Sequence, residues 1–511
     1  MKEQEYDVWY LPHSMEFELL MDELASKFAF EIEQPREESS TYFDTFDWRL
    51  HSRGFYLQHS SGKWLLSRCD SHRTAELNNG PRPGRRIFSW DFPTGKFRTL
   101  LEPVLDVRAL LPLVTLRSST TPARILNKDA KTIGFLFFES QQVKGSENVL
   151  RTVKVQGVRG YDKQQQSIRS FLHAHGVVDQ ASPRYDFAEG LRSIGRIPGD
   201  YSSKISIQLD PNLTSRQAAV LIYKQLVATM LRNEEGIVRD LDSEFLHDFR
   251  VAMRRIRSGL TQIKNVLPPD VTDHFKEEFS YVGSITGPTR DLDVYLLHEE
   301  NYKSRLPPAL QVALRTFFKD LAGRRSDEQK KLVGALNAPR YRQIINEWQQ
   351  YLEGDDDISA ANADVPVIEL ARKIISRRYK KILKDGMVII PATPDENLHR
   401  LRIQGKKLRY SLEFFASLFP EDEINLVIKQ LKGLQNNLGE FNDLSVQQDM
   451  LHGYLDGLRP GSRKNFMLAT AIGGLLTNLY HEQHRVREDF FSIFNRFSSK
   501  KNVDLFNKLF N

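Results

Sequence analysis

The chain has 511 residues, 40% hydrophobic and 27% charged, a composition typical of a folded protein of several domains. A single cysteine excludes an internal disulfide framework, and a net charge of +6 favours an anionic partner only where basic residues are concentrated. No apolar run approaches the roughly 20 residues of a membrane span, and the first residues are too polar for a signal peptide. We therefore expect a cytoplasmic protein without a membrane partner.

The first two hundred residues predict a β-rich domain. Short aromatic and β-branched runs alternate with clusters of Gly, Pro, Asn and Ser, which is typical of an antiparallel sheet or barrel. The runs cover residues 54–58, 64–67, 87–92, 113–117, 133–139 and 150–158, with amphipathic helices expected at 14–28 and 164–175. Small and turn-forming residues between 193 and 206 indicate a domain boundary.

From about Leu213 onward the pattern is helical almost without interruption. Two groups of predicted helices are separated by an acidic linker that begins near residue 353. The first group covers 214–233, 243–265, 271–285, 308–336 and 340–352, and the second covers 367–384, 395–417, 424–438 and 463–494.

The predicted helix 243–265 carries two adjacent stripes. Consecutive residues lie about 100° apart around a helix, so a stripe displaced by one position borders its neighbour. No Asp or Glu occurs from Phe249 to Pro269, so the basic stripe has no acidic partner in its own segment. The apolar stripe is Leu246, Phe249, Met253, Ile256, Leu260 and Ile263, and the basic stripe is His247, Arg250, Arg254 and Arg257.

The same pattern returns 152 residues later. Beyond the helix, Gly287 corresponds to Gly439 and Asp291 to Asp443 in the same register. An ungapped match over roughly fifty residues predicts an internal duplication of a helical unit. The second basic stripe is His399, Arg402, Lys406 and Arg409, beside an apolar stripe of Leu398, Leu401, Leu408, Leu412 and Phe415.

Cations repeated at helical spacing suit a chain of phosphates, because each phosphate accepts charge-assisted hydrogen bonds. A single basic stripe is more often a solvated face or part of a salt-bridge lattice, but the repetition and the lack of acidic partners favour a ligand. Nucleic acid is the less favoured polyanion, because only Tyr410 offers a stacking ring beside the stripes. His247-Asp248 does not predict a metal dyad, since the second copy reads His399-Arg400.

These repeated motifs resemble the CHAD family, the conserved-histidine α-helical domains. The matching segments are 247–257 with 287–294, and 399–409 with 439–446. The resemblance implies two four-helix bundles with pseudo-twofold symmetry, a basic inner surface that binds inorganic polyphosphate, and association with polyphosphate granules. The second copy departs from the motif with Gly405 and with lysines in place of two arginines. The ligand contacts implied are His247, Arg250, Arg254, Arg255, Arg257, Arg290, His399, Arg402, Lys406, Lys407 and Arg409.

The first half is similar, more faintly, to CYTH or triphosphate-tunnel domains around Tyr42-Phe43-Asp44-Thr45 and Gly54-Phe55-Tyr56-Leu57. That family uses an N-terminal Glu-x-Glu-x-Lys strand and further carboxylates to hold a divalent metal against a triphosphate. Here Glu3 and Glu5 are followed by Asp7 where the lysine belongs, and Lys154 stands among positions that should be acidic. The resemblance therefore implies a degenerate tunnel domain, with metal-dependent triphosphatase activity as the alternative.

The sequence thus predicts a two-domain α+β protein that binds inorganic polyphosphate and is not an enzyme. Residues 1–195 would form an antiparallel, tunnel-like domain. Residues 205–511 would form the all-α CHAD domain, with repeats at about 213–352 and 365–511. No catalytic residue, metal ligand or cofactor is predicted, and the oligomeric state is left open.

Overall fold

The computed structural model describes residues 7–12, 15–68, 73–145, 147, 149–179, 185–354, 360–459 and 461–511. The chain forms two compact units, Met1–Ser202 and Ser203–Asn511, which we call the sheet unit and the helical unit. Each is described separately. Among the described residues, no helix is both long and apolar enough to cross a membrane.

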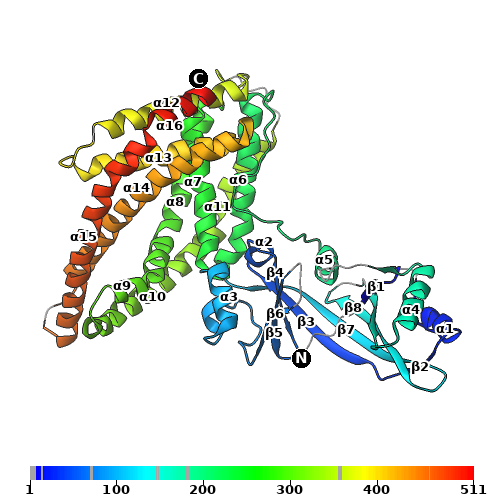
Figure 1. The fold of residues 1–511 in the computed structure, drawn as a ribbon. Helices are drawn as coiled ribbons and strands as arrows, with labels where there is room; N and C mark the ends of the chain where they lie inside the picture. The colour runs from blue at the N-terminus through cyan, green and yellow to red at the C-terminus, as the bar shows by residue number, and fades with distance from the viewer. Residues whose placement is uncertain are drawn as a thin grey trace. The chain divides into compact units, whose positions relative to one another are not determined.

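The sheet unit contains one ten-stranded antiparallel sheet, as predicted (Figure 1). The strand order is β10-β1-β9-β8-β7-β3-β4-β5-β6, and β2 pairs with β7. Among the described strands no pairing joins β6 to β10, so backbone hydrogen bonds do not close this sheet into a barrel. The strands are β1 (Asp7–Tyr10), β2 (Ala29–Ile32), β3 (Arg36–Asp44), β4 (Phe55–Ser60), β5 (Lys63–Arg68), β6 (Arg73–Asn78), β7 (Leu111–Leu126), β8 (Thr132–Val143), β9 (Val149–Gly157) and β10 (Val178–Asp179).

Two predicted strands differ from those observed. The run at 87–92 is a 3-10 turn, Ser89–Asp91, because the Asp91 carboxylate accepts the backbone N–H of Phe88 at 2.8 Å and closes the turn. The strand expected at 113–117 extends to Leu126, because β3, β2 and β8 pair with successive parts of it. The helices of this unit are α1 (Phe17–Ala25), α2 (Arg49–Ser52), α3 (Lys96–Leu105), α4 (Asp162–Ala174) and α5 (Tyr185–Arg192).

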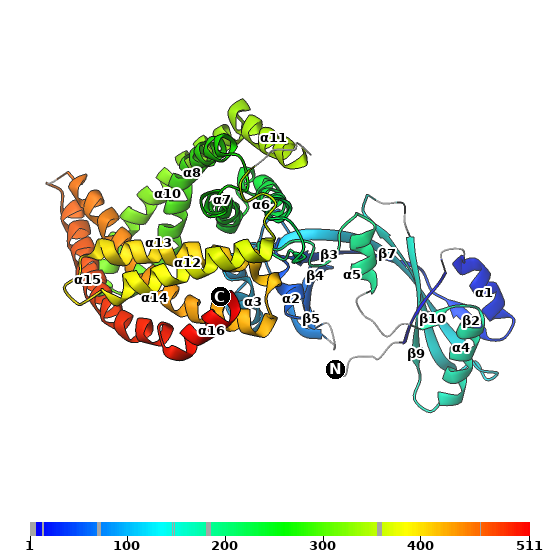
Figure 2. The same cartoon turned by 90° about the horizontal axis from the view of Figure 1, so that it is seen from above.

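The helical unit begins with a connecting segment, residues 203–214, and then consists of helices (Figures 1 and 2). The first group is α6 (Ser215–Val238), α7 (Ser243–Gln262), α8 (Pro269–Leu297), α9 (Glu299–Ser304), α10 (Pro308–Asn337) and α11 (Pro339–Glu353). The second is α12 (Val367–Met387), α13 (Asp395–Phe415), α14 (Glu421–Asp456), α15 (Arg463–Phe497) and α16 (Lys500–Phe510).

The two groups pack in the same order of neighbours. Helices α6, α7, α8 and α10 contact one another in sequence, and α12, α13, α14 and α15 do the same. Contacts between the groups join α7 to α13 and α10 to α15. Duplication and pseudo-twofold symmetry stay predictions, but α7 and α13, which carry the two basic stripes, lie side by side (Figure 2).

Two helices are longer than predicted. Helix α8 runs on past Gly287 and Pro288, and α14 runs on past Gly439. Proline removes one helical hydrogen bond and glycine weakens a helix, so these residues disfavour a continuous helix locally. Packing of α8 against α7 and α10, and of α14 against α13 and α15, outweighs that local cost. The short helix α16 was not predicted.

Candidate anion-binding site

The orientation of the basic stripes follows from burial of the apolar ones. At the start of α7 the Asp242 carboxylate accepts the backbone N–H of Glu244 at 2.9 Å and caps the helix. Every residue of both predicted apolar stripes is buried in the structure. Since α7 and α13 are fixed by these faces, the cations one position further along lie at the edge of the core, where the two helices meet.

A cavity of about 380 Å³ lies at this meeting point. Residues of α7, α13, α14 and the connecting segment line it. Six lysine or arginine side chains surround it against two carboxylates, so the lining is strongly basic. The charged or titratable lining residues are Lys204, His247, Asp248, Arg254, Arg255, Arg402, Lys406, Arg409 and Glu413.

The electrostatics show that the two stripes converge. Burial, reinforced by the charges of Arg402 and Arg254, lowers the pKa of Lys406 to about 8. Burial is also the main cause of a lowered pKa for Arg402, and Arg254 again contributes. Arg254 belongs to α7 and the other two residues to α13, so like charges from helices distant in sequence repel one another here.

Several of these cations retain unused hydrogen-bonding capacity. The Nε–H groups of Arg254, Arg402 and Arg250 are buried and have no hydrogen-bond partner among the described residues. Buried donors are normally paired, because an unpaired one loses its hydration without compensation. An anion with several oxygens would satisfy these groups and relieve the repulsion.

Arg255 has a different environment from its stripe neighbours. It is buried, and its Nη2 and Nε donate to Glu413 Oε2 at 2.7 Å and 3.1 Å. Its Nη1 donates to the Ser203 carbonyl at 2.8 Å, while Arg409 Nε donates to Glu413 Oε1 at 2.6 Å. Arg255 therefore joins α7 to α13 through Glu413 and to the connecting segment through the Ser203 carbonyl. The sequence did not single out Glu413.

Two further predicted contacts, Arg250 of α7 and Arg290 of α8, lie near Arg254. Arg250 donates to Thr286 Oγ1 at 2.8 Å, and Arg290 lies 3.6 Å from Glu244. Burial lowers the pKa of both guanidinium groups, and the charge of Arg254 adds to the effect. These two cations extend the basic surface beyond the cavity.

The remaining three predicted contacts do not line the cavity. Arg257 Nη2 donates to Ser280 Oγ at 3.3 Å, and the His399 ring Nδ1 lies 2.6 Å from Asn442 Oδ1. Lys407 lies near α12. Burial lowers its pKa, and the charges of Arg378 and Lys381 of that helix add to the effect.

The structure adds lining residues that the sequence pattern could not reveal. Lys204 comes from the connecting segment, and Gln435 and Asn436 come from α14. Lys204 lies outside any periodic pattern, and Gln435 and Asn436 are ordinary polar residues of a long helix. Only the packing of distant segments brings them to the cavity.

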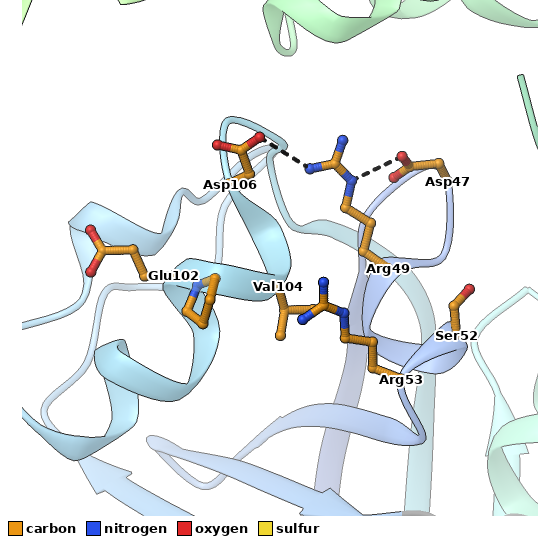
Figure 3. A pocket seen from close by; sticks show the side chains of 8 residues that line it. Asp47, Arg49, Ser52, Arg53, Glu102, Val104 and Asp106 are labelled. Atoms are coloured by element: carbon orange, nitrogen blue, oxygen red, sulfur yellow. Dashed lines mark hydrogen bonds and ion pairs between the residues drawn. The ribbon is translucent and has the colours of Figure 1, made fainter. Parts of the chain in front are cut away.

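A second pocket, in the sheet unit, differs in its charge balance (Figure 3). There Arg49 lies between two carboxylates, at 3.0 Å from Asp47 and 3.9 Å from Asp106. Its Nη1 also donates to the Leu105 carbonyl at 2.8 Å. Because these groups neutralise one another, this pocket does not concentrate charge as the helical one does.

The structure describes only some of the residues implied in metal-dependent triphosphate chemistry. Glu3 and Glu5 lie outside the described residues. Within the described part of the chain, no group of three or more His, Cys, Asp or Glu side chains could hold a metal ion. Lys154 pairs with Glu139 at 2.5 Å, so the only acidic side chain of β8 and β9 is already neutralised.

The helical unit is therefore an all-α domain with a basic cavity at the contact between α7 and α13. Residues 222–452, which lie in the helical unit, match the family model of the CHAD domain. No protein with a curated description matches the sequence.

Solved structures are similar to each half. The CHAD domain from the plant Ricinus communis is 24% identical over 58% of this chain and 95% of that one, with a TM-score of 0.49. PptA from Streptomyces chartreusis is 15% identical over 55% and 100%, with a TM-score of 0.45. On the N-terminal side, a Hippeastrum protein described as an adenylyl cyclase with dominant triphosphatase activity is 15% identical over 39% and 100%, with a TM-score of 0.27.

Proposed function

We propose that the helical unit binds inorganic polyphosphate at the cavity between α7 and α13, and that the protein acts as a polyphosphate-associated or granule-targeting protein. The observation that carries the proposal is the convergence of Arg254, Arg402 and Lys406 from two helices, with buried, unpaired Nε–H groups and a lowered Lys406 pKa. Such a site is electrostatically unfavourable when empty and is stabilised by a dense anion.

The lining favours phosphate chains over nucleic acid. Tyr410 is the only phenol or indole ring among the described residues of the cavity. Proteins that hold single-stranded nucleic acid combine basic grooves with several stacking rings. A ligand made only of phosphates needs no such rings, and arginine forks suit its oxygens.

The test is a salt titration of long-chain polyphosphate binding to the full-length protein. Replacing Arg254, Arg402 and Lys406 together by alanine is expected to reduce the slope of log affinity against log salt by about 2, at roughly 0.7 for each phosphate that is no longer neutralised. The control replaces Arg324, Lys330 and Lys331 of α10, three exposed cations, so the net charge falls equally. The control variant should keep the original slope.

Two results would overturn the proposal. Equal loss of affinity in the cavity variant and the α10 variant would show that net charge, and not the cavity, governs binding. Equal affinity for single-stranded RNA of matched charge would replace the phosphate preference with general polyanion binding.

A further inference from the structure

The end of α12 and the loop that follows it hold large apolar side chains in solvent. Met387 is 64% exposed, Val388 68% and Ile390 58%, whereas Ile389 between them is only 6% exposed and anchors the loop in the core. Isolated apolar residues at a surface are ordinary, but three within four positions form a patch.

Hydrogen bonds fix this loop. The backbone N–H of Ile390 donates to Thr393 Oγ1 at 2.9 Å, and the backbone N–H of Thr393 donates to the Ile390 carbonyl at 2.9 Å. Arg487 of α15 donates to the carbonyls of Pro391 and Thr393. The apolar side chains are therefore presented by an ordered turn.

Basic residues surround the patch. Arg400 and Lys381 line a shallow pocket of about 320 Å³ together with Val388 and Ile403. The nearby carboxylates are Asp385, which pairs with Lys381 at 3.3 Å, Asp395, which pairs with Arg487, and the exposed Glu396. The exposed cations nearest the patch, at the end of α12 and the start of α13, outnumber these carboxylates: Lys380, Lys381, Lys384 and Arg400.

This surface is separate from the polyphosphate cavity. Arg400 lies two positions from Arg402 on α13, which is about 200° around the helix. Ile403 follows Arg402 by one position and is 37% exposed, whereas Arg402 lines the cavity. We give the name outer face to the apolar residues Met387, Val388 and Ile390 together with the basic residues Lys381, Lys384 and Arg400.

We propose that the outer face docks on an anionic lipid bilayer. The apolar side chains would enter the boundary between headgroups and acyl chains, while the lysines and arginines contact lipid phosphates. Shallow apolar insertion combined with a basic surround is the pattern of interfacial membrane binding. This proposal departs from the expectation of no membrane partner, which rested on the lack of a spanning segment, because interfacial binding needs no such segment.

The test places a fluorophore sensitive to polarity on the full-length protein. Cys69 is the only cysteine, so a Cys69→Ser, Val388→Cys protein carries one label. Its emission should shift to the blue with vesicles of phosphatidylcholine and phosphatidylglycerol, but not with phosphatidylcholine alone. The matched control is Val312→Cys on α10, where the valine is 60% exposed, and its emission should not change.

Two variants separate this inference from the proposed function. Met387→Ser, Val388→Ser, Ile390→Ser keeps every charge and should reduce partition onto anionic vesicles on the order of a hundredfold, with polyphosphate affinity unchanged. Arg254→Ala, Lys406→Ala should weaken polyphosphate binding and, with the label at position 388, keep the blue shift.

Four outcomes would overturn the inference. The first is no shift at position 388 with anionic vesicles, and the second is an equal shift at position 312. The third is a blue emission at position 388 before vesicles are added. The fourth is loss of the shift in the Arg254→Ala, Lys406→Ala variant. The third would show that another part of the chain or a second copy covers the outer face. The fourth would place the vesicles at the polyphosphate cavity.

Discussion

At the scale of single residues, Lys406 gives the site a group that titrates near physiological pH. A lysine with an ordinary pKa stays charged throughout the physiological range, but burial and the neighbouring guanidinium groups lower this pKa to about 8. In the empty protein Lys406 therefore loses its proton as the pH rises through about 8. An anionic ligand favours the charged form, so binding raises this pKa and takes up a proton.

We predict that polyphosphate affinity falls as the pH rises from about 7 to about 9.5. Above the pKa of Lys406, binding requires this lysine to take up a proton from solution, and that becomes less favourable as the pH rises. The loss should be about tenfold to a hundredfold, the value of one charge-assisted hydrogen bond. Isothermal titration calorimetry across this range, in buffers of different ionisation enthalpy, measures both the affinity and the proton uptake.

The control is Lys406→Arg, which stays charged over the whole range and should flatten the pH profile without abolishing binding. A Lys406→Gln protein should bind weakly at every pH and take up no proton. An unchanged pH profile in either variant would contradict the assignment to Lys406.

The sequence predicted which residues gather at the cavity better than it predicted what each side chain contacts. Periodicity placed His247, Arg254, Arg402, Lys406 and Arg409 beside the apolar stripes, and the structure puts all five around one cavity. Whether they bind a ligand stays a prediction. The pattern could not foresee that Arg255 pairs with Glu413, since the partner lies 158 residues away on another helix.

At the scale of elements, the contact between α7 and α13 depends on the Arg255–Glu413 pair. Both side chains are largely buried, at 9% and 15% exposure. If one is removed, the other is left as a buried charge without this partner and with little access to water. Removing one partner of a buried pair commonly destabilises a protein by about 3–5 kcal/mol, whereas replacing both with apolar residues is much less costly.

We therefore predict that Glu413→Ala lowers the free energy of unfolding by about 3 kcal/mol, and that Arg255→Met, Glu413→Leu restores most of the loss. Urea unfolding followed by far-UV circular dichroism checks both. A double variant no more stable than the single one would show that the pair contributes through hydrogen bonds that apolar packing cannot replace.

Close helix packing gives a second prediction at this scale. A Cβ atom on Gly236 of α6 would lie 2.1 Å from the Phe245 ring of α7, whereas one on Gly334 of α10 would meet nothing within 4 Å. Gly236→Ala should destabilise the protein by about 1–3 kcal/mol through overpacking. Gly334→Ala should stabilise it by about 0.5–1 kcal/mol, because alanine favours a helix. Thermal unfolding of the two proteins should move in opposite directions.

Helix boundaries show what local pattern leaves out. Helix α7 was predicted almost to its ends, because Asp242 and Ser243 provide a clear start and the apolar period is regular. Helix α8 was predicted too short, because Gly287-Pro288 is a strong local breaker. Packing against α7 and α10 keeps α8 helical past these residues. Such contacts between helices are not visible in the local sequence pattern.

At the scale of the whole molecule, the cavity belongs to the helical unit alone. All its lining residues, from Ser203 onward, lie in that unit. We predict that a fragment of residues 203–511 binds polyphosphate within about threefold of the full-length affinity, a difference below 1 kcal/mol. A fragment that is folded by circular dichroism but binds far more weakly would show that the sheet unit supplies part of the site.

The two basic stripes belong to separate groups of helices, so folding brings like charges together and their repulsion opposes it. Bringing α7 and α13 together places the like charges of Arg254, Arg402 and Lys406 close to one another, and the proposed anion would offset this repulsion. Occupancy and folding are thus linked: a ligand held only by the folded state raises the melting temperature with its concentration. If the proposed anion binds, a shortage of it would lower the stability of the folded chain and so raise its exposure to proteolysis.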